Sequence, residues 1–371
     1  MSTKGKRMAG NSGKEGDISP ENYKYGAYER NKEREEENNM RKKKKMNKGL
    51  KIFLIILLVL VIIIVGLGVA GYTFVNGKIG KMQKENIDTT AVGINEETKQ
   101  ELKGYRNIAL LGIDSRADDY GLGNRSDCMI IASINQETNA VKLISVYRDT
   151  YVYVTENGTK RLDKITHAYS YGGAQNTLKS LNEALDLNIT EFVTVNFEST
   201  KDIIDKMGGV EITVTSAEAS QIPGIKSAGT YNLTGEQALA YGRIRKIDSD
   251  YARTERMRTV LTEVFNKAKK MSVADLNNVL DKVLPEVYTN ITKSDILALI
   301  PQIASYSIVD SKGWPYETKG ITLNGVWYGP PINLEKNVSQ LHKELFAQDD
   351  YVPTDKVKEI SNKIIQKTGY R

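Results

Sequence analysis

Cysteine and histidine are almost absent from this chain of 371 residues, which contains one cysteine and two histidines. The single cysteine excludes an intramolecular disulfide, and two histidines are too few for a histidine-rich metal site. The sequence also contains no Gly-x-Ser-x-Gly elbow, no P-loop, no Cys-x-x-Cys pair and no HExxH motif. Cys128 opens the apolar run CMIIASI, which favours a buried small side chain over a nucleophile. Covalent catalysis therefore has no obvious nucleophile in this chain.

The N-terminal part of the chain predicts a membrane anchor. Residues 1–51 lack a hydrophobic pattern and are rich in Lys, Glu and Asn, so a disordered basic tail is expected. Residues 52–75 contain no charge and would form about 36 Å of helix, enough to span a bilayer. A signal peptide would have a shorter apolar core and would start nearer the N-terminus. The basic run at 41–45 precedes the span, which predicts a cytoplasmic N-terminus and an extracellular remainder.

This topology changes the meaning of the net charge of +6. Residues 1–51 contain 15 basic and 8 acidic residues, whereas residues 76–371 contain 37 basic and 38 acidic residues. The positive excess therefore lies beside anionic lipid headgroups, and it gives no support for a nucleic-acid partner. An extracellular part without disulfides favours a Gram-positive-type bacterium, which has a single membrane.

Three parts are expected beyond the span. Residues 76–104 are predicted to form an extracellular stalk, residues 105–348 one domain, and residues 349–371 a C-terminal tail. Interleaved strands and helices predict an α/β or α+β layered domain rather than a sandwich. Strands are expected at 107–114, 129–135, 140–148, 150–154, 192–197, 210–214 and near 318–328, and helices at 174–187, 200–207, 234–241, 251–271, 273–284, 293–305 and 334–346.

Arginine is concentrated in the run RIRKIDSDYARTERMR at 243–258, which holds five of the 11 arginines beyond the span, against 26 lysines there. A guanidinium grips phosphate or carboxylate at two points, so this run indicates an anion site. A solvated helix laced with ion pairs is the open alternative.

Spacing within this run suggests separate positions for its charges. Arg243 and Arg245 would share a face of an extended segment, and Arg253 and Arg256 a face of the helix that follows. Asp250 lies just before that helix, where the positive helix end would keep it ionised. Arg258 is expected at the surface.

A second group of charges lies at predicted strand ends. Asp114 ends one strand and Asp127 begins the next, so the two carboxylates could converge on a hard cation; turn chemistry is the alternative. Arg148 follows a third strand and, with Arg116 and Arg125, would place three guanidiniums at one sheet edge, or else form a local ion pair. Carboxylates, arginines and a divalent cation together suit a phosphate-bearing substrate. His167 fits a polar core or capping role as well as acid–base chemistry.

Seven ordered blocks between residues 107 and 270 resemble the LytR-CpsA-Psr family. They read LLGIDSR, RSDCMIIASIN, LISVYRDTYV, KITHAYSYGG, VNFESTKDIIDKMGGV, LTGEQALAYGRIR and DYARTERMR. The resemblance implies an α/β fold, with a central mixed sheet that has helices on both sides (α/β/α) and an apolar tunnel for a polyprenyl chain. It also implies a membrane-anchored, Mg²⁺-dependent phosphotransferase. Such an enzyme moves a glycopolymer of teichoic acid or capsule type from a polyprenyl-pyrophosphate carrier to peptidoglycan through a phosphodiester bond.

The resemblance also implies residue roles. Asp114 and Asp127 match metal-linked carboxylates, and Asp250 matches the base that deprotonates the acceptor hydroxyl. Arg148 and Arg243 would act catalytically by stabilising charge on the leaving pyrophosphate. The arginines that match pyrophosphate-binding positions are Arg116, Arg125, Arg148, Arg243, Arg245 and Arg253.

The chain departs from the family pattern at three positions, where Cys128, Ala252 and Met257 replace the usual Thr, Gly and Gln. Two other functions remain open from the sequence. One is hydrolysis of a polyprenyl pyrophosphate by water, and the other is a non-catalytic binder or regulator of the cell envelope. A DNA-binding regulator is disfavoured because the domain would be extracellular and nearly neutral.

Overall fold

The structure, a computed structural model, describes residues 83–115, 119–272, 275, 278–279, 287–292 and 304–370. The predicted tail at 1–51, the predicted span at 52–75, the start of the stalk and most of the predicted helices at 273–284 and 293–305 lie outside these residues. In the described ranges, no helix combines the length and apolarity that crossing a membrane requires.

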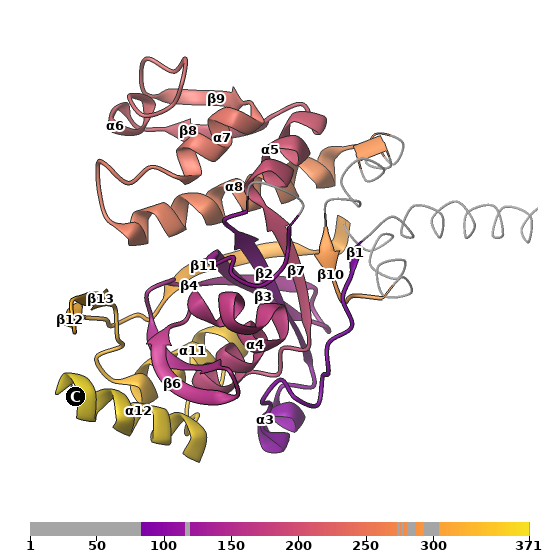
Figure 1. Ribbon diagram of the computed structural model, residues 1–371. Coiled ribbons are helices and arrows are strands. Elements are labelled where there is room, and N and C mark those ends of the chain that lie inside the picture. The colour runs from indigo at the N-terminus through magenta and orange to yellow at the C-terminus, as the bar shows by residue number, and fades with distance from the viewer. Residues whose placement is uncertain are drawn as a thin grey trace, which may run out of the picture. The chain divides into compact units, whose positions relative to one another are not determined.

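A mixed sheet lies at the centre of the fold (Figure 1). Strand β2 pairs with β3 in antiparallel and with β7 in parallel fashion, and β11 pairs in parallel with β4. Among the described residues the sheet has seven strands, in the order β1 (Gln83–Lys84), β10 (Tyr288–Thr289), β7 (Glu191–Asn196), β2 (Tyr105–Ile113), β3 (Ser126–Asn135), β4 (Ala140–Val146) and β11 (Ser307–Trp314).

Helices cover both faces of this sheet. On one face Leu111 and Ile131 share a core with Leu178 and Leu341, while on the other face Ile130 packs in a cluster with Leu261. Neighbouring residues of a strand point to opposite faces of the sheet. The strands contain continuous apolar runs, so each strand supplies apolar side chains to the cores on both faces. One face carries α4 (His167–Leu185), α11 (Leu334–Phe346) and α12 (Asp355–Thr368), and the other carries α5 (Phe197–Lys206), α7 (Gly235–Gly242) and α8 (Asp250–Lys270).

Shorter elements complete the described chain. Asn157 and Gly158 both have positive φ angles and form a hairpin turn between two strands. These elements are α3 (Glu96–Glu101), the hairpin β5 (Tyr151–Glu156) and β6 (Thr159–Lys164), the hairpin β8 (Val210–Val214) and β9 (Gly229–Leu233), α6 (Ser216–Ala219), and the hairpin β12 (Ile321–Leu323) and β13 (Val326–Tyr328).

The described parts of the predicted stalk and of the predicted C-terminal tail pack onto the domain instead of standing apart. Val92 and Leu102, from the stalk range, are fully buried in the main core. Val357 and Ile360 of α12 are buried in the same core, so the compact domain extends beyond residue 348. The apolar positions of α12 are few, but their spacing places them on one face of a helix.

The strands β9 and β11 were also not predicted.

His342 of α11 predicts a pH dependence of stability. Its ring is fully buried, stacks on Tyr351 and contacts the carbonyl oxygen of Leu185 through Nε2 at 3.0 Å. Burial lowers the pKa of His342 below its usual value. The unfolded chain therefore binds the proton more readily than the folded chain does. We expect the free energy of unfolding to fall as the pH drops below about 6.5.

Chemical denaturation between pH 7.5 and 5 measures this dependence. His342→Gln should be less stable at pH 7.5 and should show a flatter profile over the same interval. A wild-type profile that stays level below pH 6.5 would contradict the assigned cause.

Candidate active site

Three strand ends meet at one edge of the sheet and bring the predicted charges together. Asp114 follows β2, Asp127 lies at the start of β3, and Arg148 follows β4 by two residues. Because both neighbours of β3 run antiparallel where they meet this edge, the end of β2, the start of β3 and the end of β4 coincide there. The backbone N–H of Asp114 donates to the carbonyl oxygen of Arg125 at 3.1 Å and closes the loop between β2 and β3.

A polar cavity of about 320 Å³ opens at this edge. Two carboxylates and five arginines surround it, together with one methionine. Its lining residues are Asp114, Arg125, Asp127, Arg148, Arg243, Arg245, Arg253 and Met257. The structure thus gathers charged residues that are up to 139 positions apart in the chain, from Asp114 to Arg253.

The segment between α7 and α8, together with the start of α8, supplies three of the five arginines. Helix α7 begins with a capping box between Thr234 and Gln237 and ends at Gly242, so Arg243 follows directly as its C-cap. Ser249 caps α8 and accepts a hydrogen bond from the N–H of Ala252 at 3.3 Å, which shows that alanine at this position fits the helix start. Arg253, in the first turns of α8, donates through Nη2 to the backbone carbonyl of Asp127 at 3.3 Å.

A chain of ion pairs connects the cavity with the β6 strand. Arg148 Nη1 lies 2.8 Å from Asp127 Oδ1, and Lys164 Nζ lies 2.6 Å from Asp149 Oδ1. Arg148 Nε is 3.9 Å from Asp149 Oδ2, too far for a hydrogen bond. Arg148 therefore has capacity to bind an additional anion at the cavity.

Asp127 is a partly buried carboxylate at this edge. Burial raises the pKa of Asp127, Arg148 opposes the rise, and the negative charge of Asp114 adds to it. Its ion pair with Arg148 does not have hydrogen-bond angles, and the buried Oδ1 accepts no hydrogen bond from the residues that the structure describes.

These features fit a Mg²⁺ ion. A carboxylate that is buried without full compensation gains from a cation, and Asp114 places a second carboxylate at the same cavity. No cluster of three or more metal-ligating side chains exists among the described residues. Mg²⁺ commonly takes only one or two carboxylates and completes its shell with water and substrate phosphates, so two suffice.

An apolar cavity of about 200 Å³ adjoins the polar one, because Met257 lines both. It lies between the sheet and the helices α5, α7 and α8. Cys128 faces it and is half-buried, and the apolar surroundings raise the pKa of its thiol to about 12, as expected for a packing residue rather than a nucleophile. The lining residues are Leu110, Leu111, Gly112, Cys128, Ile130, Val193, Val195, Thr200, Ile203, Ile204, Leu239, Met257, Val260, Leu261 and Val264.

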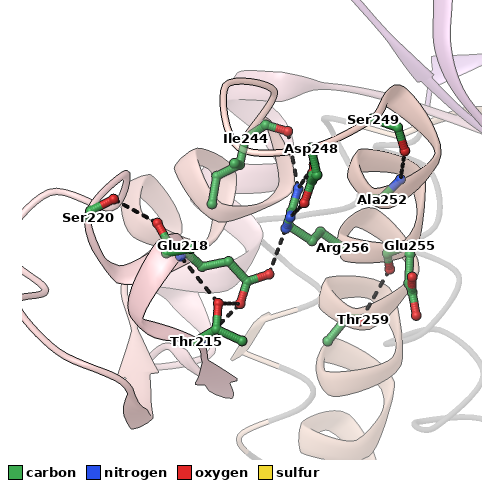
Figure 2. Close-up of polar contacts among 11 residues, drawn as sticks. Thr215, Glu218, Ser220, Ile244, Asp248, Ser249, Ala252, Glu255, Arg256 and Thr259 are labelled. Atoms are coloured by element: carbon green, nitrogen blue, oxygen red, sulfur yellow. Dashed lines mark hydrogen bonds and ion pairs between the residues drawn. The ribbon is translucent and has the colours of Figure 1, made fainter.

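Arg256 does not line the polar cavity but fixes the segment that does (Figure 2). Its Nε donates to Glu218 Oε1 at 2.7 Å, its Nη1 donates to the carbonyl of Ile244 at 3.2 Å, and both terminal nitrogens contact the carboxylate of Asp248. Burial opposes ionisation of Glu218, but hydrogen bonds from Arg256 and Thr215 outweigh it and lower the pKa of Glu218. One guanidinium therefore ties α8 to α6 and to the 243–249 segment.

Arg258 is buried, so its expected surface position is wrong. Only 7% of the residue is exposed, and its Nε donates to Ser311 Oγ of β11 at 3.0 Å. The reason is the edge strand β11, which was not predicted and which covers this side of α8.

Two predicted site residues are not fully described. Arg116 lies outside the described residues. Asp250 is the first residue of α8, three positions before Arg253 of the polar cavity. Its side chain lies outside what the structure describes.

The sequence did not single out the lining of the apolar cavity or the partners of Arg256. Unbroken apolar runs in β2 and β3 were a usable signal for a strand with both faces covered. Glu218 and Asp248 gave no signal, because acidic residues at 38 and 8 positions from Arg256 become partners only through the tertiary fold.

Comparisons with known proteins identify the family of this chain. Residues 70–346 match the model of the LytR_cpsA_psr family. A protein of Bacillus subtilis (strain 168), named polyisoprenyl-teichoic acid–peptidoglycan teichoic acid transferase TagT, is 32% identical over 296 residues, which cover 75% of this chain and 88% of that relative.

Solved structures are similar as well. A structure titled TagT bound to LIIa-WTA has a TM-score of 0.55 and 30% identity, and it covers 66% of this chain and 91% of its own. A structure of YwtF (TagT) with bound octaprenyl pyrophosphate lipid has a TM-score of 0.51 and 27% identity. The match covers most of the described domain, and the chain belongs to the LytR_cpsA_psr family.

Proposed function

We propose that this protein transfers an anionic glycopolymer from a polyprenyl-pyrophosphate carrier to peptidoglycan through a phosphodiester bond. The adjacency of an arginine-lined cavity and an apolar cavity supports this proposal most directly, since the two share Met257. A polyprenyl pyrophosphate needs both environments, one for its charged group and one for its hydrocarbon chain. Relatives named as teichoic acid transferases favour a teichoic acid as the polymer, with capsule polysaccharide as the alternative.

In the proposed reaction, an acceptor hydroxyl oxygen attacks the phosphorus atom that bears the polymer. The bond from this phosphorus to the bridging oxygen breaks, and the polyprenyl phosphate leaves with the electron pair. Asp250 takes the hydroxyl proton, and Arg148 and Arg243 stabilise the negative charge that develops on the leaving phosphate. Arg116, Arg125, Arg245 and Arg253 hold the pyrophosphate in place.

Mg²⁺ is the proposed cofactor, and Asp114 and Asp127 would hold it. When bound, the ion would neutralise charge on the pyrophosphate oxygens. The unbalanced burial of Asp127 supports this assignment.

The proposed setting is the outer face of a single bacterial membrane. The uncharged residues 52–75 would anchor the chain, with residues 1–51 in the cytoplasm and the domain outside. In this arrangement the apolar cavity is supplied with carrier lipid from the membrane that holds the anchor.

Product analysis with and without acceptor tests the reaction class. Purified protein, lipid-linked saccharide and Mg²⁺ should yield saccharide covalently attached to peptidoglycan fragments when these are present. Release of free phosphorylated saccharide at equal rate with and without acceptor would instead establish hydrolysis. Lipid that is bound but never cleaved would establish a non-catalytic binder.

Filling the apolar cavity should weaken donor binding. Val264 lines this cavity and is partly buried, so Val264→Phe would occupy part of its 200 Å³. We expect affinity for a long-chain polyprenyl pyrophosphate to fall at least about tenfold, because each excluded methylene loses about 0.8 kcal/mol. Affinity for a water-soluble, short-chain pyrophosphate should be unchanged.

Val309→Phe is the matched control, because Val309 is 56% exposed on β11. Equal weakening of the long-chain and short-chain ligands by Val264→Phe would show that the cavity does not take the lipid.

A further inference from the structure

Helix α4 presents one ridge of polar and aromatic side chains that the proposed chemistry does not use. His167, Tyr171, Gln175 and Lys179 follow each other at intervals of four residues and are all half-buried. Residues four apart lie on the same face of a helix, so His167 and Tyr171 share a face before the break at Gly172 and Gly173, and Gln175 and Lys179 share a face after it. Tyr171, Gln175 and Lys179 line one groove across this break. Ala168 and Leu178, which lie on the other side, are fully buried in the core.

A built-in kink opens a groove beside this ridge. Gly173 has a φ of +63°, and a Cβ on Gly172 would lie only 2.7 Å from Cβ of Asn176, so both positions require glycine. The Asn176 side-chain amide donates to the carbonyl of Ala168 at 2.8 Å, which the kink exposes, and to the carbonyl of Thr155 at 2.9 Å. The helix and the β5–β6 hairpin are thereby held on either side of a groove of about 450 Å³.

The groove offers hydrogen-bonding groups and a fixed aromatic ring. Tyr171 donates through its hydroxyl to the buried carboxylate of Asp163 at 3.1 Å, and Arg161 binds the same carboxylate at 2.6 Å. Gln175 and Lys179 line the groove together with Glu85. One oxygen of Glu85, Oε2, is buried and accepts no hydrogen bond from the described part of the chain.

The charge balance of the groove selects among saccharides. The lining contains one basic residue, Lys179, and one acidic residue, Glu85. Their charges cancel, so the lining has no net charge. A neutral saccharide with hydroxyl and amide groups matches this lining, with one sugar face against the Tyr171 ring. A phosphate-rich polymer would need an excess of cations, as the arginine-lined cavity has.

The start of α4 is also hydrogen-bonded to the chain beside Asp127 and Arg148 of the polar cavity. Thr166, the residue before His167, donates through its backbone N–H to the carbonyl of Arg148 at 3.1 Å and through Oγ1 to the carbonyl of Ser126 at 2.9 Å. These two bonds join the start of α4 to the strands that bear Asp127 and Arg148. The residues of α4 that line the groove, Tyr171, Gln175 and Lys179, follow this start of the helix in the chain.

We propose that this groove, lined by Tyr171, Gln175 and Lys179, binds the glycan strand of the peptidoglycan acceptor. The inference rests on the proposed transfer reaction. The donor already has two binding sites, the arginine-lined cavity for its pyrophosphate and the apolar cavity for its lipid. The acceptor has neither, and the near-neutral groove next to the cavity supplies one.

Steady-state kinetics of Gln175→Ala and Tyr171→Ala in the full chain test this role. The Michaelis constant for long glycan strands should rise about fivefold to tenfold, as expected for the loss of one or two neutral hydrogen bonds or a ring contact. The Michaelis constant for the lipid-linked donor and kcat at saturating strand should stay at the wild-type values. A single disaccharide acceptor should be used equally well by variant and wild type.

Gln100→Ala is the matched control, because Gln100 is exposed on α3. Gln175→Ala keeps the test valid if loss of the Tyr171 contacts impairs folding. An unchanged Michaelis constant for long strands would overturn the proposal, and a raised constant for the donor alone would assign the groove to the donor saccharide instead. Titration of the full chain with soluble glycan strands, without donor, measures binding of the strand to the groove even if the wild type performs no transfer.

Discussion

Arg243→Lys is expected to lower kcat/KM for glycopolymer transfer about 10²-fold to 10³-fold although the positive charge is kept. Arg243 lines the polar cavity directly after α7, where a planar fork of donors can bind two phosphate oxygens at once. A lysine ammonium makes a point contact and cannot reproduce this geometry. Loss of one well-placed donor to developing charge has this magnitude in other enzymes.

Transfer kinetics of the folded variant measure this effect, with Arg106→Lys as control. Arg106 forms an ion pair with Glu191 at 2.6 Å and does not line the polar cavity, so its exchange should leave kcat/KM unchanged. Wild-type turnover of Arg243→Lys would remove this residue from the proposed mechanism.

Arg256→Met is expected to give the largest loss of stability. The substitution keeps much of the side-chain volume but leaves Glu218 and Asp248 without their shared cation, and Arg256 is only 5% exposed. Removing one partner of a buried ion pair costs about 3 kcal/mol or more, since the charge of Glu218, whose side chain is 13% exposed, stays largely desolvated. Denaturant unfolding of Arg256→Met and of the wild type measures this difference in the free energy of unfolding.

A double variant and a transfer assay identify the cause. Glu218→Gln with Arg256→Met should recover part of the stability, because the double variant no longer buries the Glu218 charge. Transfer should also weaken in Arg256→Met below the unfolding temperature, because the 243–249 segment loses its hydrogen bond at Ile244. Stability within about 0.5 kcal/mol of the wild type would show that this network is solvated.

Much of the fold followed from local patterns in the sequence. The expected strands at 129–135 and 140–148 and the expected helix at 234–241 rest on short-range patterns, and the structure has β3, β4 and α7 at these positions. The edge strand β11 did not follow, because its sequence SIVDSKGW has no alternation of apolar and polar residues and carries charges such as Asp310 and Lys312. The order of the strands in the sheet likewise depends on contacts between distant segments.

The candidate site divides in the same way. Charges at strand ends, such as Asp114 and Asp127, could be grouped because strand ends are recognisable in a sequence. The buried state of Arg258 and the partners of Arg256 could not, because they depend on β11 and on α6. The apolar cavity was expected only through the resemblance, and its walls became defined only by the packing of α5, α7 and α8 on the sheet.

The most direct test of the central claim is the bond that the protein forms. Purified full-length protein would be incubated with Mg²⁺, a polyprenyl-pyrophosphate-linked saccharide and peptidoglycan fragments, and the products would be identified by mass spectrometry and phosphorus NMR. The proposal predicts saccharide joined to peptidoglycan by a phosphodiester, with one polyprenyl phosphate released per bond. Peptidoglycan that remains unmodified while the donor is intact, or is cleaved by water alone, would contradict it.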